Sequence, residues 1–291
     1  MADAYSPAAA AADDFDAAGI TRALGVGAVP VTFYAETDST STRARADFLF
    51  HPGGHGLYVA ASQTSGRGRQ GKAFFSPAGD GLYMTLRYCT VRPFPEWAFL
   101  TCAVSVAAAE AVAEVTGVEC GIKWVNDLYV RERKVCGILT EFCQAPEGER
   151  CVLVGIGINL RGADFPVAAG QAGSLGLTRD LRIPLCATLT RSLLRLFAAM
   201  EGGMADRADL LRRYRERSIL LGRQINYVQN GTVIPATVLG IREDGALLVR
   251  GTDGRECALQ SGEISIRFPD GQEPASVAAS VPDASGGGAR S

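Results

Sequence analysis

The chain has 291 residues, which is enough for one large domain and a small one. Apolar residues make up 47% of it and charged residues 21%, the balance of a soluble globular protein. Its formal net charge of -2 excludes a global basic field for nucleic acid or anionic lipid, so any anion site must be local.

Both ends of the chain are predicted to be loosely ordered. Residues 1–28 are weakly patterned and rich in Ala, Asp and Gly, which predicts a flexible arm. Residues 269–291 predict a disordered tail, because they cannot bury enough apolar area. The first residues carry no basic segment of a secretory signal, and the longest uncharged apolar stretch, 98–109, is too short to cross a bilayer. We therefore expect a cytoplasmic protein with no membrane partner.

The middle of the chain, residues 29–217, reads as one large domain. Longer segments predict helices at 97–115, 184–200 and 206–217. Because the strands come in clusters rather than alternating with helices, an α+β fold is favoured over a doubly wound sheet. Short apolar runs bounded by turn residues predict strands at 31–36, 56–62, 82–88, 127–130, 134–142 and 151–160.

Residues 218–268 have a different texture. Short predicted strands at 223–229, 233–241, 245–251 and 255–261 are separated by Asn-Gly and Asp-Gly turns, which are strong hairpin signals. This pattern predicts a small C-terminal SH3-like β-barrel.

The eight cysteines never occur as C-x-x-C, so the sequence offers no zinc-type ligand pair. Several lie inside apolar runs, which predicts buried, reduced thiols. The only histidines, His51 and His55, are separated by Pro and Gly residues and are expected in a loop rather than as a helical ligand pair.

A cationic glycine loop stands out at residues 63–77, QTSGRGRQGKAFFSP. A dinucleotide fingerprint needs a helix after the glycines, whereas a proline, an Asp-Gly turn and a further strand follow here. The lysine strand, H-R-D and D-F-G motifs of a kinase are missing as well. Arg67, Arg69 and Lys72 could bind an anion that the glycines let approach closely. Alternatively, the segment is a solvated hairpin tip.

Two further stretches could line a site. In KWVNDLYVRERKVCGILTEF (123–142), Lys134 beside Gly137 could neutralise a carboxylate or phosphate; alternatively, Asn126–Asp127 is a plain turn and Lys134 an exposed strand start. In VGIGINL (154–160), glycines interrupting a strand indicate close backbone or ligand approach, and the amide of Asn159 could pair with a purine edge. The alternative is a bulged buried strand.

Taken together and in this order, these segments resemble the biotin protein ligase (biotin–acetyl-CoA-carboxylase ligase) family over roughly residues 30–268. The segments are ETDSTS (36–41), the glycine loop, KWVNDLYVRERKVCGIL and GIGINL. The resemblance implies a class II synthetase-like fold with a mixed, mostly antiparallel sheet. It also implies a catalytic biotin- and ATP-binding domain at 29–217. Members join biotin and ATP into biotinyl-5'-AMP with Mg2+ and pass biotin to a lysine of a biotin carboxyl carrier domain.

The resemblance also assigns roles to residues. Lys134, Arg69 and Arg67 are the implied catalytic residues, and Asp127 is a tentative metal ligand. Biotin would be bound by Ser39, Thr40, Gln63, Gly66, Arg67, Lys134 and Gly137. ATP would be bound by Arg69, Lys72, Phe74, Lys123, Asn126, Asp127 and Asn159.

This sequence departs from the family pattern at two positions, since Val125 stands where Pro is usual and Phe74 where Trp is frequent. Only about 28 weakly patterned residues precede the first predicted strand, so we expect no helix-turn-helix and no DNA binding. A homodimer is compatible with the resemblance. The alternative functions are a lipoate- or octanoate-protein ligase of similar fold and a non-catalytic biotin sensor.

Overall fold

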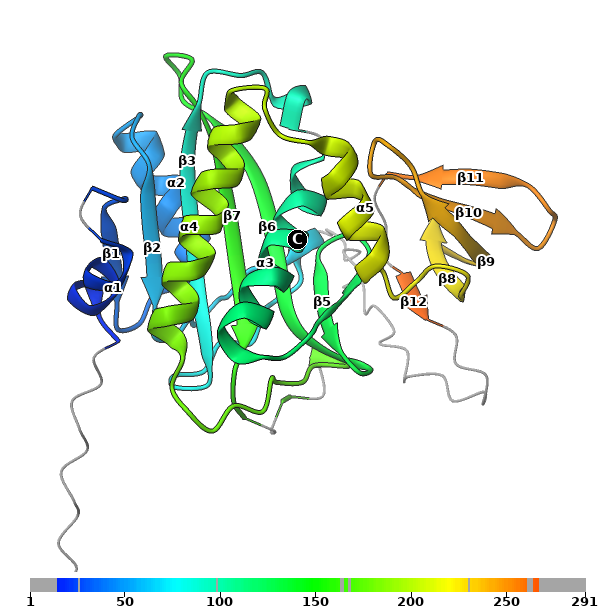
Figure 1. The fold of residues 1–291 in the computed structure, drawn as a ribbon, viewed down its shortest axis with the longest axis horizontal. Coiled ribbons are helices and arrows are strands. Elements are labelled where there is room, and N and C mark those ends of the chain that lie inside the picture. Colours follow the sequence, from blue (N-terminus) through cyan, green and yellow to red (C-terminus); the bar gives the residue numbers. More distant parts are fainter. Residues whose placement is uncertain are drawn as a thin grey trace, which may run out of the picture.

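The computed structural model describes residues 15–25, 27–97, 99–162, 165–166, 169–229, 231–260 and 264–266. Its larger part is a seven-stranded sheet with the order β1-β2-β3-β7-β6-β5-β4 (Figure 1). The strands are β1 (Val31–Tyr34), β2 (Gly56–Ala60), β3 (Gly81–Thr90), β4 (Gly121–Lys123), β5 (Asp127–Val130), β6 (Arg133–Gln144) and β7 (Arg150–Asn159).

The sheet is mixed, as the sequence predicted. Strands β1 and β2 pair in parallel, and every other neighbouring pair is antiparallel. The central strands β3 and β7 are buried along nearly their whole length because helices cover both faces. The α+β prediction is therefore confirmed.

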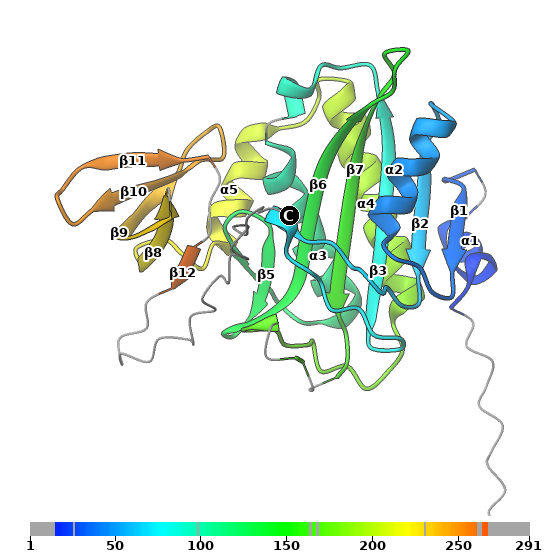
Figure 2. The same cartoon turned by 180° about the vertical axis from the view of Figure 1, so that it is seen from behind.

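Helices form a layer on each face of this sheet. On one face lie α3 (Leu100–Thr116) and α4 (Arg182–Glu201), with α5 (Arg207–Arg217) packed on α3 (Figure 1). The opposite face carries α2 (Thr40–Phe50), which contacts β2, β3 and β7 (Figure 2). By length and composition the segment Phe94–Thr116, which ends in α3, and helix α4 could each cross a membrane, but here α3 and α4 pack against each other as core helices. The short 3-10 helices are η1 (Arg69–Gly71) and η2 (Phe94–Trp97).

The prediction of a flexible arm over residues 1–28 is wrong for residues 15–24. Asp16 caps helix α1 (Ala17–Leu24), because its carboxylate accepts a hydrogen bond of 2.7 Å from the backbone N–H of Gly19. This helix packs against α4 and buries Ile20 and Leu24 in the main core. Burial of these two apolar side chains on one face of the helix stabilises it, although the segment is only weakly patterned. Residues 1–14, and the predicted tail at 269–291, lie outside the described residues.

A second sheet follows α5. Its order is β11-β10-β9-β8-β12, and all neighbouring strands are antiparallel. Its contact with the larger sheet includes Trp124, whose indole N–H donates a 2.9 Å hydrogen bond to the carbonyl of Gly245 in the β9–β10 turn. The strands are β8 (Gln224–Gln229), β9 (Thr232–Ile241), β10 (Leu247–Gly251), β11 (Glu256–Leu259) and β12 (Ile264–Ile266).

The cysteines behave largely as the sequence predicted. All eight are free, and six are buried. Burial also raises the pKa of several of these thiols, that of Cys186 to about 12. Cys257 is exposed, and Cys89 is half-buried with its pKa raised mainly by burial.

We expect a short pulse of iodoacetamide to alkylate Cys257 fastest and Cys89 more slowly, because only a thiolate that reaches solvent reacts. The six buried thiols should react only after denaturation. Mass spectrometry of the pulsed protein measures this order. Labelling of Cys186 as fast as that of Cys257 would contradict the packing of α4.

Candidate active site

The glycine loop folds back on itself. The carbonyl of Gly66 accepts a 2.8 Å hydrogen bond from the backbone N–H of Phe74, and the N–H of Gly68 donates to the carbonyl of Lys72 at 2.7 Å. A Cβ atom at position 66 would lie 2.3 Å from the Phe74 carbonyl oxygen, so only glycine fits there. The loop is therefore a hydrogen-bonded hairpin whose tip, residues 70–73, is exposed.

This fold places the ring of Phe74 on the sheet. Gly137 on β6 and Gly157 on β7 are register partners. A Cβ atom on Gly157 would lie 2.5 Å from the Phe74 ring, and one on Gly137 would lie 3.1 Å from it. The missing side chains of the two strands thus make room for the ring. Interrupting glycines in a strand indicated this kind of close approach.

Lys134 reaches the same place from the side. The Cβ position of Gly137 is 3.3 Å from the Lys134 Nζ atom, so this amine and the Phe74 ring approach the same glycine. Nζ also forms an ion pair of 2.8 Å with Oδ1 of Asp127, and both side chains are mostly buried. The predicted cation and the tentative metal ligand are therefore partners of each other.

Arg69 joins the loop to the turn before β5. Its Nη1 donates a 3.0 Å hydrogen bond to Oδ1 of Asn126. Asn126 is itself fixed, because its Nδ2 donates to the carbonyl of Ile138 on β6 at 2.7 Å. This turn starts β5 at Asp127, as the sequence predicted. It also puts Arg69 and Lys134 next to successive residues, 126 and 127.

Polar residues at the start of α2 and at the base of the glycine loop form a separate group. The backbone N–H of Thr40 donates to Oε1 of Gln63 at 2.9 Å, and Gln63 Nε2 donates to Oγ of Ser76 at 2.9 Å. Ser39 is buried and precedes α2 as its N-cap residue. The structure thus brings Ser39, Thr40 and Gln63 together.

Three further residues predicted to bind ATP are Lys123, Asn159 and Lys72. The Lys123 Nζ atom stands 5.4 Å from the centroid of the Tyr129 ring, one strand beyond Asp127. Asn159 Nδ2 donates to the carbonyl of Gly173 at 2.9 Å. The N–H of Gly173 donates to the carbonyl of Lys134, so Asn159 and Lys134 share this neighbour. Lys72 is exposed at the end of η1.

Two shifted pKa values describe the electrostatics near the site. Burial alone would raise the pKa of Asp38, but donors from the Ser39 backbone and the Arg43 and Thr37 side chains outweigh it and lower that pKa. Burial, reinforced by the charge of Asp127, raises the pKa of Tyr129, so its hydroxyl stays protonated at neutral pH.

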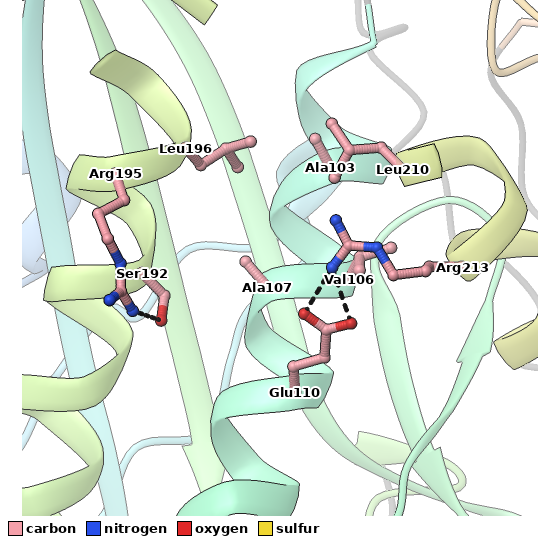
Figure 3. Close-up of a pocket in the computed structure, with 9 residues that line it drawn as sticks. All are labelled: Ala103, Val106, Ala107, Glu110, Ser192, Arg195, Leu196, Leu210 and Arg213. Atoms are coloured by element: carbon pink, nitrogen blue, oxygen red, sulfur yellow. Dashed lines mark hydrogen bonds and ion pairs between the residues drawn. The ribbon is translucent and has the colours of Figure 1, made fainter. Parts of the chain in front are cut away.

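A cavity away from this centre lies among α3, α4 and α5 and has a volume of about 300 Å³ (Figure 3). Its charged lining is dominated by the ion pair of Arg213 with Glu110. We place the candidate site at the loop rather than here, because the loop gathers the cations, the amides and the glycine floor.

Gly157, one of the interrupting glycines of VGIGINL, supports the Phe74 ring. Two other residues that contribute to the site carried no sequence signal: Ser76 orients Gln63, and Glu141 binds two arginines. No local pattern distinguishes it from an ordinary surface acid.

Residues 33–159 match the model of the Biotin/lipoate A/B protein ligase family. A "Biotin--[acetyl-CoA-carboxylase] ligase" of Paracoccus denitrificans is 32% identical over 240 residues, which cover 76% of this chain and 95% of the relative. The chain therefore belongs to the biotin protein ligase family.

Other relatives are longer than the matched region. The "Bifunctional ligase/repressor BirA" of Escherichia coli is 30% identical over 72% of this chain, and the match spans 65% of that protein. With its counterpart in Bacillus subtilis the identity is 38% over 112 residues, and the match spans 34% of that protein. Among solved structures, a biotin protein ligase from Aquifex aeolicus in complex with biotin and ATP is 25% identical. It covers 82% of this chain and 98% of its own, with a TM-score of 0.67.

Proposed function

We propose that this protein is an ATP-dependent, AMP-forming biotin–[acetyl-CoA-carboxylase] ligase. It joins biotin and ATP into biotinyl-5'-AMP and then transfers biotin to a lysine of a biotin carboxyl carrier domain. The observation that carries this proposal is the meeting of Lys134, Phe74 and the floor of Gly137 and Gly157 under one cationic loop. The named relatives and the solved complex with biotin and ATP support the choice of substrates.

The proposed chemistry needs cations at one point. A biotin carboxylate that attacks the α-phosphate brings two anions together, and preorganised positive charge stabilises the negative charge of the transition state. The amine of Lys134 and the guanidinium of Arg69 would supply this charge, and the incoming phosphate would compete with Asp127 for Lys134. The nucleophile of the second step is an amine of the carrier, so the ligase itself needs none.

The substrates would divide the site between them. Ser39, Thr40 and Gln63 would hold the bicyclic head of biotin, with the backbone of Gly66 and Arg67 closing over it. The N–H and the hydroxyl of Thr40 both donate to Oε1 of Gln63. These polar groups support this role, because they would bond to the ureido group of biotin in place of each other. Lys72, Phe74, Lys123, Asn126 and Asn159 would lie on the ATP side.

Mg2+ would reach the site bound to the phosphates of ATP. In the part of the chain that the structure describes, no group of three or more His, Cys, Asp or Glu side chains could hold a metal. A single carboxylate suits Mg2+ bound mainly by phosphates and water, because this ion keeps several waters. Asp127 would be that carboxylate, and the ion would add positive charge at the phosphates.

The setting of the enzyme belongs to the same proposal. Strands β8 to β12 would form the small SH3-like barrel, with the catalytic domain at 29–217. The partner would be the carrier domain of a biotin-dependent carboxylase in the cytoplasm, with neither DNA nor membrane bound. A homodimer is compatible with this proposal.

The deciding experiment measures biotin-dependent pyrophosphate release from ATP, followed by mass spectrometry of a biotin carboxyl carrier domain. A gain of one biotin on one lysine is expected. A lipoate- or octanoate-protein ligase would instead be stabilised by lipoate in a thermal titration, and a biotin sensor would bind biotin without releasing pyrophosphate. Either result would overturn the proposal.

We expect the Arg69→Gly variant to form the adenylate at a reduced rate and to lose it to solvent. In the wild-type protein the Arg69 guanidinium donates a hydrogen bond to Asn126. Without that hydrogen bond the loop covers the hydrolysable mixed anhydride less well. Filter retention of labelled biotinyl-5'-AMP measures the release rate. Retention as tight as in the wild-type protein would remove Arg69 from this covering role.

A further inference from the structure

Three cysteines form a row across the large sheet, outside the candidate site. Cys89 on β3 is the register partner of Cys151 on β7, and Cys151 is the register partner of Cys143 on β6. Register partners on neighbouring strands carry their side chains on the same face of a sheet. All three pack in the small core beneath α2, which also contains Phe48. Among the described residues no group of three or more His, Cys, Asp or Glu side chains could hold a metal, so the row is not a metal site.

The backbone hydrogen bonds make Cys89 and Cys151 a non-hydrogen-bonded pair. Such pairs alternate with hydrogen-bonded pairs along an antiparallel ladder. At one end of the β3–β7 ladder the N–H of Leu160 donates to the carbonyl of Asp80 at 2.8 Å, and an odd number of unbroken register steps leads from there to Cys89. At the other end the Cys89 N–H points away from β7, because it donates to Nδ1 of His55 at 3.1 Å. In a pair of this kind the Cα atoms lie about 4.5 Å apart.

This geometry favours one disulfide partner for Cys151. A disulfide needs Cα atoms about 4.4–6.8 Å apart and Cβ atoms closer still, and the side chains of a non-hydrogen-bonded pair approach most closely. The pair of Cys151 with Cys143 is of the hydrogen-bonded kind, in agreement with the bond of 2.8 Å from the N–H of Ala145 to the carbonyl of Glu149 two register steps away. Its side chains stand farther apart. Cys89 is therefore the better partner.

Cys89 is also the member of the row that a reagent can reach. It is half-buried, whereas Cys143 and Cys151 are buried. Its thiol donates a hydrogen bond of 2.8 Å to the carbonyl of Gly54, an exposed residue just before β2. A small disulfide arriving there would meet Cys89 first, with Cys151 as its register partner behind it.

We propose that Cys89 and Cys151 are a modification site, which a low-molecular-weight disulfide converts into a cross-strand disulfide bond. The Cys89 thiolate attacks one sulfur of oxidised glutathione, forms a mixed disulfide and releases one glutathione thiolate. The Cys151 thiol loses its proton to solvent, and its sulfur attacks that of Cys89 and releases the second glutathione thiolate. Two protein thiols are thereby oxidised, and one small disulfide is reduced to two thiols.

The bond is conditional on the surroundings of the protein. In a reducing compartment the pair stays as two thiols, and the bond forms when small disulfides accumulate. The proposal does not depend on the proposed function, because a protein without ligase activity should form the same bond.

Burial should make the reaction slow and dependent on pH. It raises the pKa of Cys89, and it raises that of Cys151 together with the neighbouring thiols of Cys143 and Cys89. The thiolate is the attacking species, and below the pKa its fraction rises about tenfold for each pH unit. The rate of bond formation should therefore rise about tenfold from pH 7 to pH 8. A rate that does not change with pH would overturn this route.

The test treats the folded full chain with oxidised glutathione, blocks the remaining thiols with iodoacetamide and maps linked peptides without reduction. Trypsin releases Cys151 in the peptide 151–161, which contains no other cysteine, and separates it from Cys143. We expect this peptide to be joined to the one that contains Cys89. Fragmentation in the mass spectrometer should place the bond at Cys89, and dithiothreitol should reverse it.

Three controls make the result specific. Cys257 should stop at the mixed disulfide with glutathione, because its register partner on β10 is Val249. Cys89→Ser should leave Cys151 unmodified, whereas Cys143→Ala changes the other register neighbour of Cys151 and should form the bond at the wild-type rate. A bond from Cys151 to Cys143, lasting glutathione on Cys89, or equal oxidation of Cys151 in Cys89→Ser would overturn the inference.

The bond should also stabilise the fold. It closes a loop of roughly 60 residues in the unfolded chain, and a crosslink of this size restricts the unfolded state. We expect the melting temperature of the oxidised wild-type protein to rise by about 5 °C and that of Cys89→Ser after the same treatment to stay unchanged. A linked protein that melts no higher than the reduced one would show that the bond distorts the pair, and would reject the proposed fit.

Discussion

The Lys134→Ala variant is expected to form biotinyl-5'-AMP at least ~100-fold more slowly than the wild-type protein, the scale of losing one preorganised electrostatic group. In the wild-type protein the Lys134 Nζ atom lies beside the glycine floor, where a carboxylate and a phosphate would meet. There it forms an ion pair of 2.8 Å with Oδ1 of Asp127. Because the charge matters most when the two anions react, the loss should fall on the rate rather than on binding. Single-turnover pyrophosphate release measures it.

Two controls keep this prediction specific. Lys134→Arg retains the charge in a different shape and should be slower than wild type but faster than Lys134→Ala. Removing the lysine also leaves the mostly buried Asp127 carboxylate unpaired, so thermal unfolding of each variant must be followed. A folded Lys134→Ala protein with wild-type turnover would exclude Lys134 from the mechanism.

Gly66→Ala should be the second severe substitution. An added Cβ atom would lie 2.3 Å from the Phe74 carbonyl oxygen, a backbone atom that cannot move without opening the loop. Overpacking costs about 1–3 kcal/mol. If this cost falls on the closed loop alone, its population drops about 5- to 150-fold. We expect adenylation to fall by a similar factor while the melting temperature changes little.

Gly68→Ala is the matched control for that substitution. It lies two residues away in the same loop, has extended backbone angles, and would place its Cβ atom 3.1 Å from its nearest neighbour, the carbonyl oxygen of Lys72. Its adenylation rate should stay within a few-fold of wild type. Equal losses in both variants would show that the loop tolerates no side chain anywhere, rather than a specific clash at position 66.

The predicted strands and helices α3, α4 and α5 followed from their apolar sequence patterns, because the central sheet and the α3–α4 layer are buried. Helix α2 was missed for a physical reason. Its first turn is Thr-Ser-Thr, residues of modest helix propensity, and Ser39 makes no side-chain cap hydrogen bond. Helix α1 had a visible cap at Asp16, but its short apolar face was outweighed by composition.

The candidate site was predictable as far as single residues carry distinctive chemistry. Glycines, arginines and Lys134 marked the loop and the strand start. Their pairing was not predictable, because Lys134 with Asp127 and Arg69 with Asn126 depend on which strands are neighbours. Glu141 shows the limit most clearly, since its partners are 74 and 96 residues away along the chain.

The hydrogen bond from Trp124 to Gly245 connects the small sheet to the candidate active site. Trp124 precedes by two residues the asparagine that receives Arg69, and its indole is buried, so its N–H has no water to turn to. A substitution that reshapes the turn around Gly245 would therefore displace the turn at Asn126, where ATP is expected to bind. The catalytic sheet and the small sheet are therefore expected to respond together to a substitution at this contact.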